Sequence, residues 1–380
     1  MQIKIKSSSV CLLLIFLSAF YQLPVVKFNL TFVSLTLLPF FAFVCWYKRL
    51  AIKVGFVFVI SLMLYLVFVT LYFGWEGGSY SIINIAFYLS TLFLLRVSVQ
   101  YYSFGTCFVA FYFGSLLFYT YELISRFYNV FYEESVLVSS FYVLKMNGTV
   151  FNDTNVVGLN VLFLFIMSMS FARSSAGALN HQLNSFYFRL SQLYLFILII
   201  LTFSRAAIII AFAYCFYLFI LRVNLVFKFI FLVGAFFAMF FIVNIISEDT
   251  SFLSRFSIVN NFVVFIYNMG FTEFLFGVGV LSWTSIYQII GLDLSRFDFV
   301  GHLFFFQMLA FGGVIFLINF LFILIFHSNS KSGLLLFCVY LLLGLSYIEL
   351  FSYMFWGMLA FCSIYSSCYF YRSNINECIL

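Results

Sequence analysis

Long uninterrupted runs of apolar residues, separated by short polar segments, make up most of the sequence. A helix of about 17–25 apolar residues crosses a hydrocarbon core of about 30 Å. The runs predict twelve transmembrane helices, at residues 8–23, 25–47, 52–73, 81–98, 102–121, 156–172, 188–203, 206–221, 228–246, 302–326, 333–348 and 351–371. A transmembrane barrel needs alternating strands of about ten residues instead. We therefore expect an all-α polytopic integral membrane protein, with one transmembrane domain over residues 1–380.

Composition agrees with a membrane protein. Of the 380 residues, 66% are apolar and only 8% are charged. A water-soluble domain needs much more surface charge than this to stay dispersed. The N-terminal sequence MQIKIK and the apolar run after it are similar to a signal peptide. No small-residue cleavage site follows, so we expect a retained first helix.

Two longer polar segments interrupt the apolar runs. We expect residues 122–155 to form the first long loop and residues 247–301 the second. Apolar residues of the second loop have helical spacing, at positions 252, 256, 259, 263, 266 and 267. This spacing predicts an interfacial helix that lies along the membrane surface and ends at Gly270.

The distribution of basic residues predicts the orientation of the chain. With the N-terminus in the cytoplasm, twelve of the 18 lysines and arginines fall in inner segments. The six in outer segments are Lys27, Arg126, Lys145, Arg205, Arg255 and Arg296. This is the positive-inside bias. It predicts that both long loops face outward and that both termini are cytoplasmic.

One histidine stands out in this arrangement. Of the three histidines, only His302 falls on the predicted outer side. It follows the charged segment Asp293–Gly301 and precedes the apolar run 303–326. An imidazole can exchange a proton near neutral pH, so His302 is a candidate catalytic residue. The alternative is that His302 only marks the boundary between membrane and water.

Arg205 lies in a very short outer turn between two apolar runs, in the sequence Thr202–Phe203–Ser204–Arg205. An arginine at the centre of a bilayer costs about 2.5–3.5 kcal/mol. At the outer surface it is either a topological anchor or the partner of an anion. Anchors belong on the inner side under the positive-inside rule, so this position favours an anion at headgroup depth.

Two further polar clusters accompany these residues. The first long loop ends in NGTVFNDTNVVG, in which Asp153 and Thr154 can cap a helix that begins near Asn155. The segment Gly277–Val278–Gly279 has glycines at alternate positions. Such glycines permit a tight turn or a close approach of the backbone to a ligand.

Taken in order, the segments FNDTNVVG, TFSRAA, LSRF, GVG and GHLFFFQMLAFGG resemble the bacterial O-antigen polymerase and ligase superfamily. The resemblance covers roughly residues 148–316. The chain departs from the family pattern at Leu303, where asparagine is usual. It also departs at Ala310–Gly312, where a glutamate commonly precedes the glycine.

The resemblance implies a fold similar to the lipid-dependent, GT-C-like glycosyltransferases. It implies transfer of a glycan from undecaprenyl diphosphate to an acceptor hydroxyl, at the periplasmic face of the bacterial inner membrane and with no metal or other cofactor. Arg205 and Arg255 are then expected to hold the diphosphate, and His302 to take the acceptor proton or to orient a ligand. The expected substrate-binding residues are Arg296, Asp153, Asn155 and Arg126.

Three functions remain open at this point. The first is an O-antigen polymerase of lipopolysaccharide biosynthesis, whose donor and acceptor are both undecaprenyl-diphosphate-linked oligosaccharides. The outer segments carry eleven acidic and six basic residues, which disfavours the phosphorylated acceptor of an O-antigen ligase, the second function. The third is a flippase for lipid-linked oligosaccharides, which needs charges within its spans. The expected partners are membrane lipids, a chain-length regulator and a separate flippase, and no nucleic acid.

Overall fold

The computed structural model describes most of the chain as α-helix. The described residues are 7–20, 36–47, 54–73, 79–132, 150–151, 154–174, 183, 185–224, 262–291, 304–327, 331–344 and 352–377. These segments contain no β-strand. The prediction of an all-α protein is therefore confirmed for the described part of the chain.

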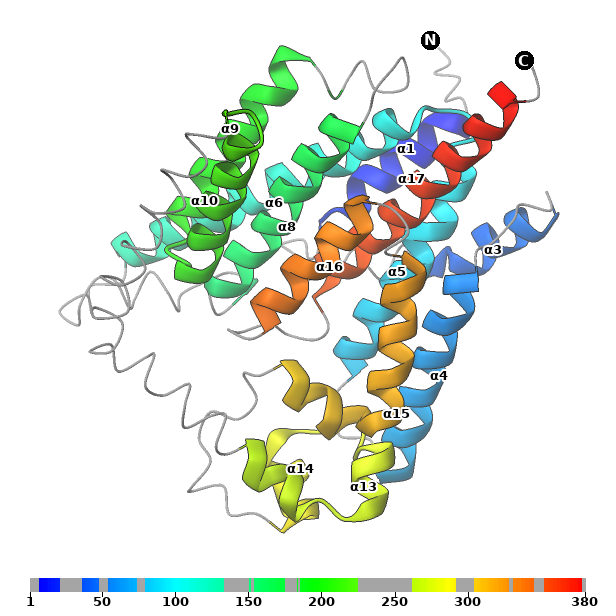
Figure 1. Cartoon of the computed structure of the whole chain (residues 1–380), viewed down its shortest axis with the longest axis vertical. Helices are drawn as coiled ribbons and strands as arrows, with labels where there is room; N and C mark the ends of the chain where they lie inside the picture. The colour runs from blue at the N-terminus through cyan, green and yellow to red at the C-terminus, as the bar shows by residue number, and fades with distance from the viewer. Residues whose placement is uncertain are drawn as a thin grey trace.

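The helices are labelled in Figure 1. They are α1 (Ser7–Ser18), α3 (Leu38–Tyr47), α4 (Val54–Phe73), α5 (Ser79–Ser98), α6 (Phe104–Tyr132), α8 (Thr154–Ser174), α9 (Phe186–Leu201), α10 (Arg205–Ile220), α13 (Phe271–Phe276), α14 (Trp283–Ile290), α15 (Phe304–His327), α16 (Lys331–Gly344) and α17 (Tyr353–Glu377). Residues 262–268 are also helical.

Each predicted span that falls within the described residues contains a helix. The predicted span 228–246 lies outside them. Three helical segments are long and apolar enough to cross a membrane, namely Phe104–Asn129, Thr154–Arg173 and Phe306–Phe326. Shorter apolar helices, of 10–17 described residues, account for the other predicted spans in this part of the chain. A membrane-embedded helical protein is thus supported, and the number of twelve spans stays a prediction.

The first long loop begins later than the sequence predicts. The helix α6 continues past residue 121 to Tyr132, so Glu122 and Arg126 lie on a helix. The apolar pattern breaks at Glu122, but that carboxylate pairs with Arg126 one turn later. An ion pair at this spacing supports a helix, so the polar residues do not end it. The loop also ends earlier than expected, because α8 begins at Thr154.

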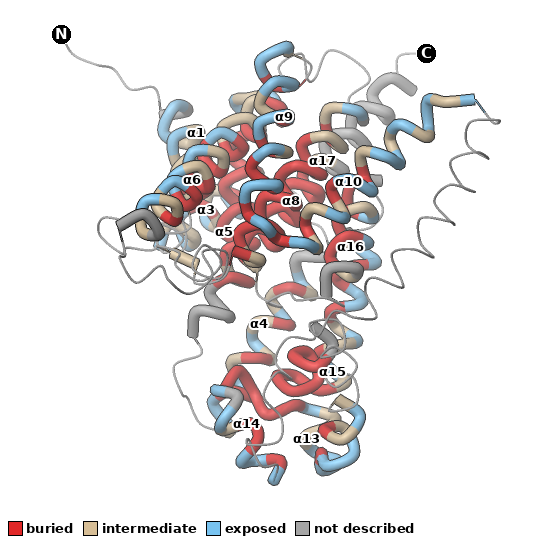
Figure 2. The backbone as a smooth tube through the Cα atoms, turned by 90° about the vertical axis from the view of Figure 1, so that its left-hand side faces the viewer, coloured by how far each residue is buried: buried red, intermediate tan, exposed pale blue. Residues whose placement is uncertain are grey.

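The core of the bundle lies around α5, α8 and α17, where buried residues predominate (Figure 2). The helix α17 packs most extensively against α5. Every residue from Tyr353 to Ile364 is buried, and the Phe355 ring stacks on Tyr340 with centroids 3.6 Å apart. This part of α17 is therefore enclosed by the neighbouring helices.

The peripheral helices expose large apolar side chains instead. On α4 the Phe68 side chain is 69% exposed, and on α10 Ile209 is 65% exposed. Similar residues occur along the outer surface of α9. A soluble monomer does not expose apolar surface on this scale. These surfaces are suited to contact with lipid chains.

The ends of the helices group as the predicted topology requires. At one end of the bundle, the ring of Phe104 lies 5.1 Å from Phe171 and 5.1 Å from Tyr365. All three are predicted to be near the inner surface. At the other end, Phe151 stacks on Tyr353, and both are predicted to be near the outer surface. The helix α1 begins and α17 ends at the same end of the molecule (Figure 1). Which end faces the cytoplasm stays a prediction.

A second group of helices extends from the bundle. The helix α4 runs along α15, and α13 packs against α15 at the lower end of the molecule in Figure 1. The helix α15 is broken at Gly313, whose φ of 63° and ψ of −164° are not helical. The break divides α15 into a short first half and a longer second half.

Candidate functional site

Two polar motifs from distant parts of the sequence meet at the predicted outer end of the bundle. The first is the start of α8, and the second is the turn between α9 and α10. A Cβ atom on Gly158 would lie 2.6 Å from Ser204 Cβ and 2.7 Å from Thr202 Oγ1. Real Cβ atoms essentially never approach other atoms this closely. Only glycine at position 158 therefore lets the turn lie directly on α8.

The turn reverses the chain in three residues. Thr202 caps α9, and its Oγ1 donates a hydrogen bond to Ile199 O at 2.7 Å and accepts one from Ser204 N at 3.3 Å. Phe203 has a φ of 53°, and it is the only non-glycine residue with positive φ in the described part of the chain. A bulky residue in this conformation is strained. Such strain persists only where the surroundings enforce it, here by Thr202 and the contact with α8.

The same end of the bundle has the chemistry of an anion-binding site. The helices α8, α10 and α17 all begin there (Figure 1). The first N–H groups of a helix have no intrahelical acceptor, and its N-terminus has a positive potential that attracts phosphate. Arg205 is the first residue of α10 and its side chain is exposed.

Two buried hydroxyl groups lie at the starts of α10 and α8. The Oγ atom of Ser204, the N-cap residue of α10, and Oγ1 of Thr154 are buried, and neither has a hydrogen-bond partner within the described residues. Buried hydroxyls normally find a partner. Both oxygens are covered by protein, so they do not by themselves mark a ligand site.

A buried ion pair supports the start of α8. Arg126 Nη2 lies 3.1 Å from Glu122 Oε1, and the two side chains are 1% and 0% exposed. The Glu122 carboxylate also accepts hydrogen bonds from Val150 N at 3.2 Å and Phe151 N at 3.3 Å. Arg126 donates to the carbonyl of Phe151. The pair therefore attaches the backbone that leads into α8 to the side of α6.

The start of α17 also contacts α6 and α8. Ser352 Oγ donates a hydrogen bond to Asn160 Oδ1 of α8 at 2.8 Å. The hydroxyl groups of Tyr119 and Tyr353 are hydrogen-bonded to each other. The Phe151 ring stacks on that of Tyr353, with centroids 6.4 Å apart and planes at 9°. The beginnings of α8 and α17 are thus fixed to α6 and to each other.

A second contact between distant parts of the sequence joins the segment Gly277–Gly279 to the first half of α15. Val278 N donates to Ala310 O at 2.8 Å, and Gly279 N donates to Phe311 O at 3.0 Å. A Cβ on Gly277 would lie 2.4 Å from a backbone nitrogen of α15. From the sequence, we expect these glycines to permit either a tight turn or a close approach of the backbone to a ligand. The structure shows a close approach of one backbone to another.

These contacts explain how α15 can be broken. A break in a helix leaves carbonyl groups without their usual N–H partners, and within a membrane such groups need a replacement. The segment Gly277–Gly279 provides two N–H donors. Tyr65 of α4 adds its hydroxyl, which lies 2.9 Å from Gly312 O. The first half of α15, which His302 precedes by two residues in the sequence, is therefore held by α13, α4 and the segment between α13 and α14.

The structure describes only some of the predicted site residues. His302, Arg255, Arg296 and Asp153 lie outside the described residues, so their proximity to Arg205 stays a prediction. Asn155 lies in the first turn of α8 and is partly buried.

Arg126 is buried against Glu122, and these contacts give it a structural role. Glu122 and Gly158 have structural roles that the sequence did not predict. The signal for Gly158 was a glycine within an otherwise apolar helical run.

Among the described residues, no group of three or more His, Cys, Asp or Glu side chains is arranged to hold a metal ion. No protein-family model matches the chain, and neither a curated protein nor a solved structure matches it. The functional assignment therefore depends on the chemistry of the residues themselves.

Proposed function

We propose that the protein is a membrane glycosyltransferase that polymerises undecaprenyl-diphosphate-linked oligosaccharide repeat units at the periplasmic face of the inner membrane. One observation carries this proposal. Arg205 lies at the start of α10, where the turn that precedes it packs on the start of α8. This arrangement is suited to a diphosphate at headgroup depth, because the helix N-termini and the guanidinium all attract anions.

In the proposed reaction, a hydroxyl of the acceptor sugar attacks the anomeric carbon of the donor sugar. The bond between this carbon and the diphosphate oxygen breaks, and undecaprenyl diphosphate leaves. Arg205 stabilises the charge that grows on the diphosphate. Each charge-assisted hydrogen bond from its planar guanidinium contributes about 1.5–3 kcal/mol.

The acceptor proton needs a base on the same side of the membrane. His302 is the only histidine in the predicted outer segments, and general base catalysis contributes about 10²–10⁴ in rate. Arg255 is the proposed second ligand of the diphosphate. Arg296, Asp153 and Asn155 are proposed to contact the sugars or the lipid-linked donor. The reaction is proposed to need no metal ion.

A polymerase suits the charges of the chain better than a ligase. The predicted outer segments carry eleven acidic and six basic residues, so a polyanionic lipopolysaccharide core is a poor acceptor. A lipid-linked repeat unit carries its negative charge at a single diphosphate instead of across a polyanionic core, so the repulsion is weaker. A chain-length regulator and a flippase in the same membrane are the proposed partners.

The lipopolysaccharide of a gene-deletion strain separates the three candidate functions. A single repeat unit on the core supports a polymerase. Bare core, with polymer retained on the lipid carrier, indicates a ligase. Failure to deliver any repeat unit to the periplasm indicates a flippase. Either of the last two results overturns the proposal.

Substitutions of Arg205 test its proposed role in the same strain. We expect Arg205→Ala to abolish polymer, and Arg205→Lys to leave a small fraction because it keeps the charge but loses the planar fork. Lys331→Ala is the matched control, since it removes one positive charge from the predicted inner side. If Arg205→Ala makes full-length polymer at normal protein levels, Arg205 acts only as a topological anchor.

The role of His302 is tested with purified protein and lipid-linked repeat units in the presence of a chelator. His302→Ala should remove most turnover while the lipid-linked substrate still binds. Glutamine can donate and accept hydrogen bonds but is not a base near pH 7, so substantial turnover in His302→Gln would show an orienting role. A requirement for a divalent ion, or normal turnover in His302→Ala, would contradict the proposed mechanism.

A further inference from the structure

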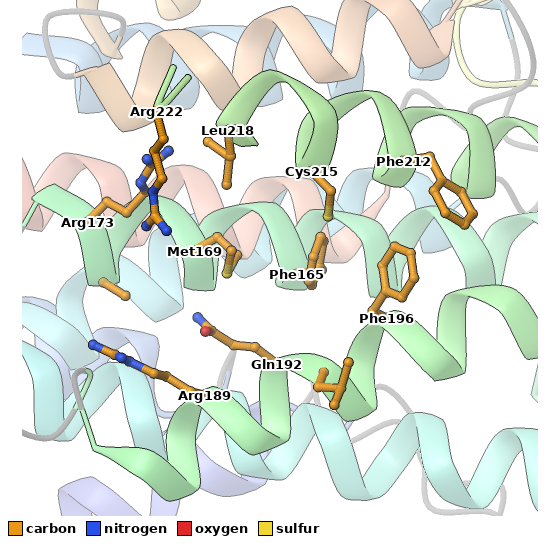
Figure 3. A pocket seen from close by; sticks show the side chains of 12 residues that line it. Phe165, Met169, Arg173, Arg189, Gln192, Phe196, Phe212, Cys215, Leu218 and Arg222 are labelled. Carbon is orange, nitrogen blue, oxygen red and sulfur yellow. The ribbon is translucent and has the colours of Figure 1, made fainter. Parts of the chain in front are cut away.

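A cavity of about 650 Å³ lies between α8, α9 and α10, at the end of these helices opposite to Arg205 (Figure 3). Three arginines line one end of it. Arg173 is in the last turn of α8, Arg189 is in the first turn of α9, and Arg222 follows the C-cap residue of α10. Figure 3 shows the three side chains gathered at one end of the cavity, with the aromatic side chains at the other.

The positive charge at this end is not balanced by acidic side chains. The only ion pair among the described residues is Glu122–Arg126, so no described carboxylate neutralises Arg173, Arg189 or Arg222. The predicted inner segments of the whole chain contain a single acidic residue, Glu377. Like charges that converge without counterions repel one another. The three arginines are exposed, so solvent weakens the repulsion, and an anion between the three guanidinium groups reduces it further.

The other end of the cavity is apolar. Its walls include Phe165, Phe196 and Phe212. The side chains of Leu193 and Phe212 are 56% and 53% exposed, so this end of the cavity adjoins the apolar outer surface of α9 and α10. A lipid chain can therefore reach it from the side. The amide of Gln192, which donates to Ser168 Oγ at 3.3 Å, is the polar group between the two ends.

Topological anchoring alone does not explain this arrangement. The positive-inside rule requires basic residues near the inner surface, but it does not require three of them to line one cavity. A small inorganic anion would satisfy the arginines and leave the aromatic end unexplained. A zwitterionic lipid would bring a cationic group of its own close to the arginines, whereas an anionic phospholipid brings none. A cavity of this size accommodates a headgroup and the adjoining part of an acyl chain.

We propose that this cavity is a binding site for an anionic phospholipid of the cytoplasmic leaflet. The phosphate lies between Arg173, Arg189 and Arg222, and one acyl chain lies along Phe196 and Phe212. Basic pockets between transmembrane helices on the cytoplasmic side are suited to anionic headgroups. This site is separate from the proposed catalytic end and does not depend on the proposed function.

The test compares lipid retention by native mass spectrometry after purification in mild detergent. The full-length protein is equilibrated with equal amounts of phosphatidylglycerol and phosphatidylcholine. We expect each protein to retain one phosphatidylglycerol molecule in preference to phosphatidylcholine. The double substitution Arg173→Gln with Arg222→Gln should weaken this retention at least tenfold, since each arginine near an anionic lipid contributes several-fold. Lys331→Gln is the matched control, because Lys331 is a basic residue at the start of α16 on the predicted inner side, whereas the cavity is lined by α8, α9 and α10.

Two further arms separate a phospholipid from other anions. Cys215 lines the cavity, and Cys215→Trp should fill its apolar part and release phosphatidylglycerol with the arginines intact. Inorganic phosphate at millimolar concentration should not displace the lipid. Equal retention in all variants would mean nonspecific lipid and would overturn the proposal. Displacement by phosphate, normal retention in Cys215→Trp, or preferential retention of undecaprenyl phosphate over phosphatidylglycerol would also overturn it.

Discussion

The contact between α8 and the α9–α10 turn depends on the absence of a side chain at Gly158. In Gly158→Ala, the new Cβ would meet Ser204 Cβ at 2.6 Å, whereas ordinary contact begins at 3.4 Å. The turn must therefore move away from α8. Arg205 follows Ser204 directly, so the substitution moves Arg205 without altering its chemistry.

The expected effects on stability and on turnover differ in size. Overpacking costs about 1–3 kcal/mol, and alanine regains about 0.5–1 kcal/mol over glycine within a helix. The net loss of stability is then small, about 0–2.5 kcal/mol. A misplacement of about 1 Å in a catalytic site can lower the rate about 100-fold. We expect turnover of lipid-linked repeat units, measured as the length of polymer on a gel, to fall at least tenfold.

Gly114 provides a matched control. A Cβ on this α6 residue would lie 2.4 Å from Phe16 O of α1 and 2.9 Å from the Cβ of Ala19, which follows α1, away from Arg205. Gly114→Ala should therefore lower the thermal midpoint at least as much as Gly158→Ala, but leave the turnover of the folded protein unchanged. Normal turnover in Gly158→Ala would refute the link between this contact and the position of Arg205. Equal losses of turnover in both variants would refute it too.

Three further predictions concern the framework of the site. Arg126→Ala should destabilise the protein by about 3–5 kcal/mol because it leaves Glu122 buried without its partner, and Arg126→Met with Glu122→Gln should recover much of this in thermal unfolding. Gly313→Ala should destabilise the break in α15, because its φ of 63° with ψ of −164° is suited only to glycine and a Cβ would lie 2.4 Å from the carbonyl of residue 275; a thermal midpoint equal to that of the unaltered protein would contradict this. Alkaline phosphatase fused after Glu134 should be active and after Ser330 inactive, and the opposite pattern would overturn the predicted orientation.

The positions of the helices could be predicted well from the sequence, because a membrane span needs only a continuous apolar run of sufficient length. The predicted start at residue 206 and the observed start of α10 at Arg205 differ by one residue. The prediction failed at α6, where it ended the helix at residue 121. Hydropathy counts Glu122 as a polar residue, and it does not include the pairing with Arg126 that makes burial of both acceptable.

The candidate site could be predicted only in part. The sequence identified the polar segment before α8 and the turn at Arg205 as important, but it could not show that they touch. That contact depends on Gly158, which is in van der Waals range of residues more than forty positions away. The backbone pairing of Val278 with Ala310 was equally inaccessible. Hydrogen bonds between distant backbone segments leave no periodic signal in the side chains.

The two places where the backbone departs from regular helix support a common interpretation. Irregular backbone in a membrane protein is tolerated where protein groups satisfy it or where it lines a cavity. Phe203 lies in a strained turn held by Thr202 and α8. The break at Gly313 is held by N–H groups of the segment 277–279. Both departures adjoin motifs on the predicted outer side, and strain of this kind is kept where it contributes to function. The contact with α8 at Gly158 and the hydrogen bonds from the segment 277–279 hold these two irregular segments in fixed positions. Substitutions that relax either segment should therefore affect turnover more than those that weaken the core by an equal amount.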